Sequence, residues 1–256
     1  EIGLKQSLSN STGVEITAFF RDINDLAGTA TDPILIAGTS ARYGKFVNSD
    51  FGFVRGIILR FDQRIASDFS VNLDYTFQVA KGNASDPAAV FNAAQAKQER
   101  EQQIVPLDWD QTHTANISMT YSNQEQNWGF GIISSFGSGL PFTPSQTTQQ
   151  TGVILPTTIQ LNSQPKPTTW DVDLTVYKGF RMGEAQMQVF AKIDNVFDRK
   201  NEYGVFGDTG RATYSLQKNV DAASFQGNTS FLDRWYPRPD FYAEPRRVTL
   251  GVSYRF

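Results

Sequence analysis

The chain has 256 residues with a net charge of −3, and 39% of its residues are hydrophobic. It therefore lacks the basic excess that binding to nucleic-acid phosphates requires, and no stretch approaches the roughly 18 consecutive apolar residues of a membrane-spanning helix. Cysteine is absent, which excludes disulfides, thiolate metal sites and a cysteine nucleophile.

Alternating apolar and polar residues predict an all-β chain with nine strands. The clearest pattern covers 69–79, where Phe69, Leu73 and Phe77 share one face while Asn72 and Asp74 lie on the other. Each expected strand has one apolar and one polar face. In chain order these strands cover residues 2–8, 14–26, 51–64, 69–81, 112–121, 128–137, 169–180, 185–196 and 246–256.

The connections between the expected strands alternate between short and long. Short ones lie at 9–13, 65–68, 122–127 and 181–184, and long ones at 27–50, 82–111, 138–168 and 197–245. Compact soluble domains rarely contain even one structureless loop longer than about 15 residues. Tight periplasmic turns and long extracellular loops are typical of outer-membrane barrels. The sequence thus predicts a transmembrane antiparallel β-barrel in the bacterial outer membrane, with a periplasmic C-terminus.

Nine is an odd number of strands, whereas bacterial single-chain barrels normally have an even number. The first strand must also begin at the long-loop end if the last one ends at the short-turn end. We therefore expect residues 1–256 to be part of a larger barrel and to begin within it.

A helix is expected inside the second long loop. Asp86 and Pro87 precede an alanine-rich run that extends to residue 101, which predicts an Asp N-cap with proline at the first helical position. This helix could pack over the barrel mouth, or it could be a solvent-exposed part of the loop without a specific role.

In the last expected strand, apolar and polar residues alternate as far as the terminal phenylalanine. Its apolar face resembles the C-terminal signature of outer-membrane barrels, and this resemblance implies recognition by the barrel-assembly machinery. An aromatic residue at a strand end is also common at any membrane interface and occurs in soluble sheets. The expected assembly signal consists of Val248, Leu250, Val252, Tyr254 and Phe256.

Several further stretches resemble the TonB-dependent receptors. The clearest contains Asn195-Val196-Phe197-Asp198, which is similar to an N-[LV]-F-[DN] run frequent in the penultimate strand of that family. The resemblance implies a 22-stranded barrel with an N-terminal plug, which imports a bulky, scarce nutrient with energy passed through TonB. This chain would supply about nine C-terminal strands, without the plug or the TonB box. The matching stretches are 106–116, 136–144, 192–201 with 205–211, and 245–248.

The sequence offers weak candidates for chemistry. His113 follows Asp108 and Asp110, so a His-Asp-Asp metal cluster is conceivable, but a lone histidine at the barrel mouth favours a hydrogen-bonding or structural role. Asp171 and Asp173 share one polar face, where we expect a lumenal acidic pair opposite arginines of neighbouring strands.

Asp194 and Asn195 are expected to form hydrogen bonds at a strand end. We expect neither an enzyme nor a cofactor, and no metal site.

The last long loop contains the best ligand-contact candidates, because aromatic and arginine side chains combine apolar area with fixed hydrogen-bond geometry. The alternative role for these aromatic residues is a membrane girdle combined with packing inside the loop. The candidates are Arg234, Trp235, Tyr236, Arg238, Phe241 and Tyr242.

The leading hypothesis is a TonB-dependent importer of a siderophore, glycan, peptide or cobalamin. A passive porin, a scaffold barrel within a surface complex and a soluble β-sheet binding module remain alternatives. Expected partners are outer-membrane lipid and lipopolysaccharide, the barrel-assembly machinery, and TonB through the missing plug. A surface lipoprotein or filament is a further candidate partner. Nucleic acid is not an expected partner.

Overall fold

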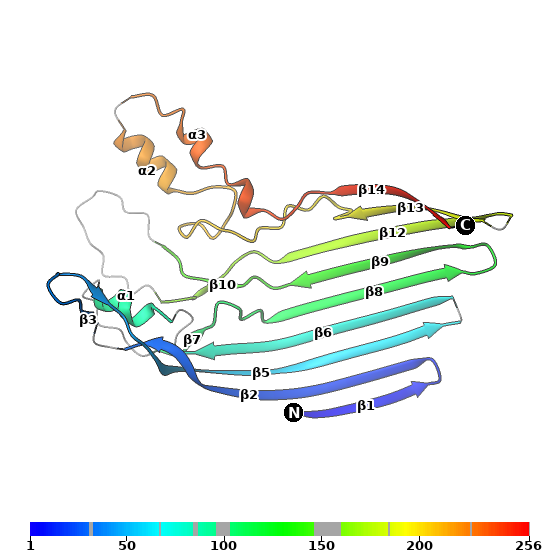
Figure 1. Ribbon diagram of the computed structural model, residues 1–256, viewed down its shortest axis with the longest axis horizontal. Coiled ribbons are helices and arrows are strands. Elements are labelled where there is room, and N and C mark those ends of the chain that lie inside the picture. The colour runs from blue at the N-terminus through cyan, green and yellow to red at the C-terminus, as the bar shows by residue number, and fades with distance from the viewer. Residues whose placement is uncertain are drawn as a thin grey trace.

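The computed structural model describes residues 1–30, 33–66, 68–83, 87–95, 103–145, 160–183, 185–225 and 227–255. Nine long strands lie side by side in chain order, and all of their pairings are antiparallel (Figure 1). The sheet is open, with the first and last strands at its edges. These strands are β1 (Ile2–Ser9), β2 (Thr12–Thr29), β5 (Phe46–Ile65), β6 (Phe69–Gly82), β8 (His113–Asn123), β9 (Trp128–Gly137), β12 (Thr169–Met182), β13 (Ala185–Asp194) and β14 (Arg247–Arg255).

All nine expected strands are confirmed, but the hairpin of β2 and β5 is longer than predicted. Strand β5 begins at Phe46 instead of residue 51, and it pairs with β2 as far as Thr29. Shifts in register beyond Ile23 accommodate the extension, and Asp25 has a φ of 58° at this irregularity. Such bulges let a strand bend while it remains paired, so this hairpin continues past the rest of the sheet.

The short elements all belong to the four long connections, which gather at one end of the sheet, while the tight turns lie at the other end (Figure 1). Helix α1 (Ala89–Gln95) confirms the helix expected in the second connection. Residues 96–101 of the expected run and its proposed cap, Asp86, lie outside the described residues. The other short elements are β3 (Ile34–Leu35), β4 (Arg42–Tyr43), β7 (Val105–Pro106), β10 (Pro141–Phe142), β11 (Gln164–Pro165), α2 (Gln217–Ser224), α3 (Leu232–Trp235) and the 3-10 turn η1 (Pro239–Phe241).

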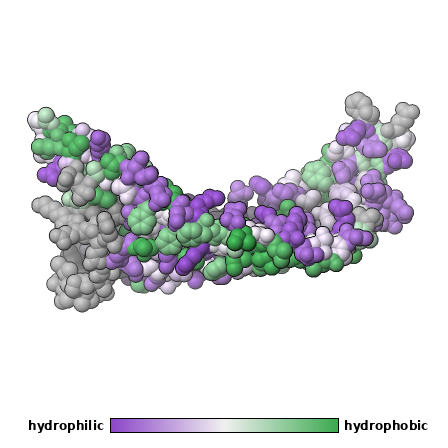
Figure 2. All heavy atoms as spheres, turned by 90° about the horizontal axis from the view of Figure 1, so that it is seen from below, coloured by the Kyte–Doolittle hydropathy of each residue, from purple (hydrophilic) through white to green (hydrophobic). Residues whose placement is uncertain are grey.

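The register gives the sheet two chemically different faces, because directly paired residues in antiparallel strands share a face. One row across six strands contains Leu4, Ile16, Leu59, Tyr75, Ala115 and Phe136. The neighbouring row on the opposite face contains Lys5, Glu15, Arg60, Asp74, Asn116 and Ser135. Figure 2 shows the sheet bowed, with hydrophilic residues along its hollow side and hydrophobic residues on its bulging side.

The apolar face is open to its surroundings. Leu250 on β14 has 76% of its surface exposed, and many other large apolar residues of this face are also exposed. A soluble sandwich would bury this face under a second sheet, and none covers it in the part of the chain that the structure describes. The small buried apolar cluster of Val54, Ala80 and Leu107 instead lies where the strands meet the long connections.

Aromatic side chains mark both ends of the apolar face. At the turn end, the Tyr121 ring lies 5.0 Å from Trp128 and 5.6 Å from Phe130, measured between centroids. At the loop end, His113 contacts Phe77 and Trp170 contacts Phe197. Aromatic belts at both edges of an apolar band are characteristic of barrels in a bilayer. Among the described residues, no helix has the length and apolarity needed to cross a membrane.

Candidate functional site in the long connections

The last long connection begins at a sharp turn built by Asn195. Its φ is 52°, a conformation that asparagine tolerates better than most residues. The Asn195 Oδ1 atom accepts a hydrogen bond from the Arg199 backbone N–H at 2.9 Å, and its Nδ2 donates to the Arg199 carbonyl at 3.0 Å. The expected strand-end hydrogen bonding of Asn195 is thus confirmed. Asp194, the last residue of β13, also accepts a hydrogen bond from Arg247 Nε at 3.1 Å, and it forms ion pairs with Lys192 and Arg247.

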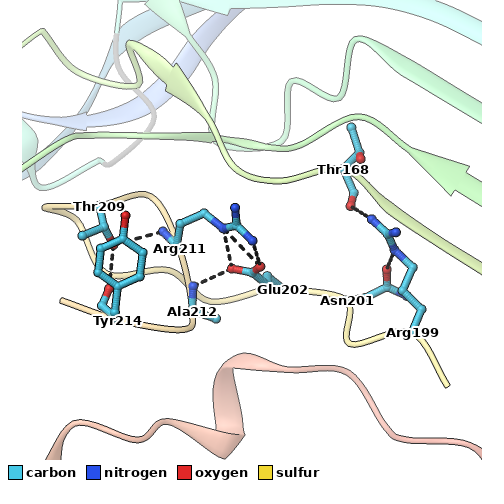
Figure 3. Close-up of polar contacts among 8 residues, drawn as sticks. All are labelled: Thr168, Arg199, Asn201, Glu202, Thr209, Arg211, Ala212 and Tyr214. Atoms are coloured by element: carbon cyan, nitrogen blue, oxygen red, sulfur yellow. Dashed lines mark hydrogen bonds and ion pairs between the residues drawn. The ribbon is translucent and has the colours of Figure 1, made fainter.

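The buried Glu202 carboxylate organises the next segment (Figure 3). It accepts hydrogen bonds from Arg211 Nη2 at 2.7 Å, from Arg211 Nε at 3.2 Å and from the Ala212 backbone N–H at 2.5 Å. Burial disfavours the charged carboxylate, but the Arg211 and Ala212 donors outweigh this effect and hold the pKa of Glu202 below its usual value. Glu202 therefore closes the segment 202–212 into a compact loop.

A second carboxylate, Asp208, fixes the start of α2. Its Oδ2 accepts from Ser215 Oγ at 2.8 Å and from the Gln217 backbone N–H at 3.0 Å. At the other side of this helix, Asp221 accepts a hydrogen bond from the Tyr236 hydroxyl at 2.5 Å, which ties α2 to the residue after α3. Burial, together with this hydrogen bond, raises the pKa of Tyr236 to about 12. The tyrosine therefore stays a proton donor at all physiological pH values.

The structure brings some of the predicted ligand-contact residues together and leaves others apart. Phe206 contacts both Tyr236 and Phe241, with centroid distances of 6.1 and 5.2 Å. The Arg238 guanidinium lies 4.3 Å from the Phe241 centroid. Tyr236, Arg238 and Phe241 thus pack within the last connection, which is the loop packing given above as their alternative role.

The remaining candidates occupy different settings. Tyr242 forms an isolated β-bridge with Glu202, and burial raises its pKa. Trp235 is 76% exposed and makes no ring contact with any described residue, and the neighbouring Arg234 is also exposed. Of the six candidates, Arg234, Trp235 and Arg238 are exposed, and Arg238 is paired with Asp240.

Hydrogen bonds join the second, third and fourth long connections in series, and join the second connection to the end of β2. The Ser145 N–H donates to the Gly207 carbonyl at 2.8 Å, which joins the third connection to the fourth. Asn162 Nδ2 donates to the Pro106 carbonyl at 2.9 Å and to Asp108 at 2.7 Å, which joins the third to the second. The Phe91 N–H then donates to Thr29 Oγ1, at the end of β2, at 3.0 Å. Sequence analysis missed these contacts, because no local pattern indicates which loops touch.

A cavity of about 260 Å³ lies on the polar face near the long connections. Trp109 contributes to its wall from a turn anchored by Asp110, whose carboxylate accepts the Ala80 N–H at 2.9 Å. Arg21 and Glu1 bring side-chain charges of opposite sign to walls that are otherwise largely apolar. The cavity can therefore accept an apolar group. Its lining residues are Glu1, Phe19, Arg21, Ile23, Val54, Ile58, Gln78 and Trp109.

The residues of the conceivable metal cluster have separate partners. The His113 Nδ1 lies 2.8 Å from the Tyr75 hydroxyl, while Asp108 bonds Asn162 and Asp110 bonds Ala80. No group of three potential metal ligands occurs among the described residues. His113 thus has the hydrogen-bonding role that was expected for a lone histidine at this position.

The prediction that Asp171 and Asp173 lie opposite arginines of neighbouring strands was wrong. Asp171 accepts a hydrogen bond from Ser135 Oγ at 2.5 Å, and Asp173 accepts one from the Asn195 N–H at 2.9 Å. The register explains the difference, because it places Ser135 directly opposite Asp171 and brings the Asn195 turn beside Asp173. Neither carboxylate forms an ion pair with a described residue.

The expected assembly signal lies on one face of β14. Val248 and Leu250 pair with Ile193 and Ala191 of β13, and their side chains belong to the exposed apolar face. Val252 and Tyr254 continue this row, whereas Phe256 lies outside the described residues.

Comparisons with known proteins agree on the fold. A family model described as "TonB dependent receptor-like, beta-barrel" matches residues 1–196. The closed form of the ferric-catecholate import receptor Fiu from E. coli K12 has 14% identity and a TM-score of 0.54, over 98% of this chain and 26% of that chain. FpvA of P. aeruginosa, bound to heterologous pyoverdines, has 10% identity and a TM-score of 0.54 over the same shares.

The FpvAI–pyocin S2 complex gives 11% identity and a TM-score of 0.55, over 98% of this chain and 25% of that chain. At this level of identity, the structural likeness is evidence of fold only. No curated protein sequence matches the chain. The chain thus spans about a quarter of the length of the solved structures that it resembles.

Proposed function

Because this chain belongs to the TonB-dependent receptor-like β-barrel family, we propose that it forms wall strands and outer loops of an active outer-membrane importer. The observation that carries the proposal is the register of the sheet, which gives one continuous apolar face for lipid and one polar face for a lumen. Energy would come through TonB, by way of a plug region of the full-length receptor.

The proposed orientation places the tight turns in the periplasm and the long connections outside the cell, with residues 1–256 as the C-terminal part of the barrel. The exposed row of Val248, Leu250, Val252 and Tyr254 would be read by the barrel-assembly machinery before it meets lipid. Lipopolysaccharide would surround the loop end of the apolar face. A surface lipoprotein or filament could contact the outer connections.

The proposed cargo is a bulky, scarce nutrient of the siderophore, glycan, peptide or cobalamin class. Fiu is a ferric-catecholate import receptor, and FpvA was solved with bound pyoverdines, which supports testing iron chelates first. Trp235 and Arg234 are the proposed outer contacts because they are exposed on α3. The cavity beside Arg21 and Trp109 is the proposed deeper contact, and it suits an apolar group.

The proposal is tested with the full-length protein that carries this chain, in a strain that has lost its own copy. Uptake of a panel of labelled iron chelates, oligosaccharides, peptides and cobalamin is measured with and without TonB. Uptake that disappears without TonB supports the proposal. Uptake of small solutes that persists without TonB would indicate a passive channel, and no uptake of any probe would favour a scaffold role.

Trp235→Ala and Lys218→Ala provide a matched pair on the last connection. Lys218 forms an exposed ion pair with Asp233 at 2.7 Å, and exposed pairs contribute little to stability. If Trp235 is an outer contact, its truncation should raise the substrate concentration for half-maximal uptake roughly tenfold, as expected for a binding hot spot. K218A should leave this concentration nearly unchanged.

A further inference from the structure

The polar face of the sheet changes character near its loop end. In the middle of β5 this face carries Arg60, which forms ion pairs with Glu15 at 3.1 Å and with Asp74 at 3.3 Å. Strand alternation places Ile58 and Val54 on the same face, nearer the long connections. An apolar island therefore interrupts the polar face, and it coincides with the cavity of about 260 Å³ described above.

The walls of this cavity are held in place by the fold. Phe19 of β2 pairs directly with Gly56 of β5, and a Cβ at Gly56 would lie 2.7 Å from the Phe19 ring. The ring therefore needs the space that a glycine leaves beside it. Trp109 follows a segment that is fixed to β6, because the Leu107 N–H donates to the Ala80 carbonyl at 3.0 Å. Walls that are positioned in advance lower the cost of binding a ligand.

The polar groups of the cavity have no partners among the described residues. The Arg21 guanidinium, the Gln78 amide and the Trp109 indole N–H form no hydrogen bond with any of them. The Glu1 carboxylate also forms neither a hydrogen bond nor an ion pair there. These groups are therefore available to a ligand that enters the cavity.

The combination of walls and free polar groups favours one class of ligand. A chelate with several negative charges would meet the Glu1 carboxylate, and a sugar would leave hydroxyl groups without partners against the apolar walls. A peptide instead carries apolar side chains next to neutral groups with one donor and one acceptor, both of which the Gln78 amide can pair with. A cavity of about 150 Å³ accepts benzene, so this cavity has room for an aromatic side chain.

We propose that the cavity binds an apolar side chain of a peptide cargo, while Gln78 pairs with the neighbouring peptide group. The inference rests on the proposed function, because it names the cargo class of the deeper contact. Arg21 and Glu1, which have opposite charges, would lie beside the peptide backbone without requiring a net charge on the cargo.

The test uses the full-length protein that carries this chain, purified in a neutral detergent. Isothermal titration calorimetry measures the binding of glycyl-phenylalanyl-glycine and of triglycine. The two peptides have the same backbone and the same charges, so the difference in affinity reports the burial of the benzyl group. We expect the phenylalanine peptide to bind at least about tenfold more tightly.

Two variants test the walls and the amide separately. Gln78→Met removes the amide at nearly constant length, and it should weaken binding of the phenylalanine peptide about two- to tenfold, as expected for a lost neutral hydrogen bond. Gln188→Met is the matched control, because Gln188 lies exposed on the polar face of β13 and outside the cavity. Trp109→Ala removes part of the wall and should weaken binding of the phenylalanine peptide more than binding of triglycine. Heat-modifiable migration in gels confirms that each variant is folded.

Equal affinities for the two peptides, equal effects of Q78M and Q188M, or no peptide binding by the unmodified protein would overturn the proposal. Maltohexaose or a ferric tris-catecholate that binds more tightly than the phenylalanine peptide, and loses affinity in W109A, would also overturn it in favour of another cargo class.

Peptide binding in detergent does not depend on TonB, so the two proposals can fail separately. A protein that binds the phenylalanine peptide but imports nothing would refute the proposed function. A protein that imports another cargo in a TonB-dependent way, and does not bind the peptide, would refute only this inference.

Discussion

Replacing Glu202 with glutamine should loosen the last long connection while leaving the sheet intact. The substitution keeps the side-chain volume but removes the charge that accepts from Arg211 and from the Ala212 N–H. The new side-chain NH2 group also faces the Arg211 guanidinium, and a guanidinium has no hydrogen-bond acceptor for it. The loss should therefore be confined to the segment that these hydrogen bonds close.

The expected magnitude follows from the burial of the two partners. The Glu202 side chain is 8% exposed and that of Arg211 is 51% exposed. A hydrogen bond to a charged group contributes about 1.5–3 kcal/mol, whereas a fully exposed ion pair contributes about 0–1 kcal/mol. A half-buried pair should lie between these limits, at about 2 kcal/mol, which corresponds to roughly a 30-fold increase in local opening.

Amide hydrogen exchange of the full-length protein in detergent measures this opening directly. The Ala212 amide should exchange about 30-fold faster in E202Q, in line with the estimated loss of about 2 kcal/mol. Asp240→Asn is the control, because it breaks the exposed pair of Asp240 with Arg238 in the same connection. Unchanged exchange at Ala212 in E202Q, or an equal change in D240N, would refute the assigned role of Glu202.

Three further predictions concern pH, packing and loop coupling. The pKa of Glu202 is lower in the folded protein than in the unfolded chain. Its stabilising effect should therefore be complete above the unfolded pKa of about 4.3, and it should disappear as the pH falls through the folded-state pKa. Faster amide exchange in the last connection when the pH is raised from 5 to 7, after correction for intrinsic exchange rates, would contradict this prediction. Gly251→Ala should lower the free energy of unfolding by about 1–3 kcal/mol, because a Cβ at this position meets the Phe190 ring. Gly131→Ala should be tolerated, because its Cβ meets nothing closer than 4.0 Å. Denaturant-dependent gel migration measures both variants, and equal stability of the two would refute the packing argument. Asn162→Gly keeps the positive φ accessible but removes the side-chain amide that holds the second connection. Amide hydrogen exchange in residues 103–110 should therefore accelerate. If these amides stay as protected as in the unmodified protein, the connections are not coupled through this side chain.

The predicted functional residues illustrate where sequence reasoning ends. Tyr236 and Phe241 are aromatic residues near arginines, a composition that fits a binding surface and a packed loop equally well. Tyr236 bonds Asp221 across 15 positions and both rings contact Phe206. Local composition carries no information about these partners, so only the folded connection distinguishes the engaged aromatics from the exposed Trp235.

The sequence by itself determined the strands, their two faces and the alternation of short and long connections. These features depend on the period-two alternation of side chains and on local turn residues, both of which are written in consecutive positions. The tertiary structure decided the partners of Asp171, the extension of β5 and the series of contacts between connections. These features depend on register and on contacts between segments far apart in the chain. A carboxylate opposite a serine and one opposite an arginine look the same in sequence until the neighbouring strand is in place.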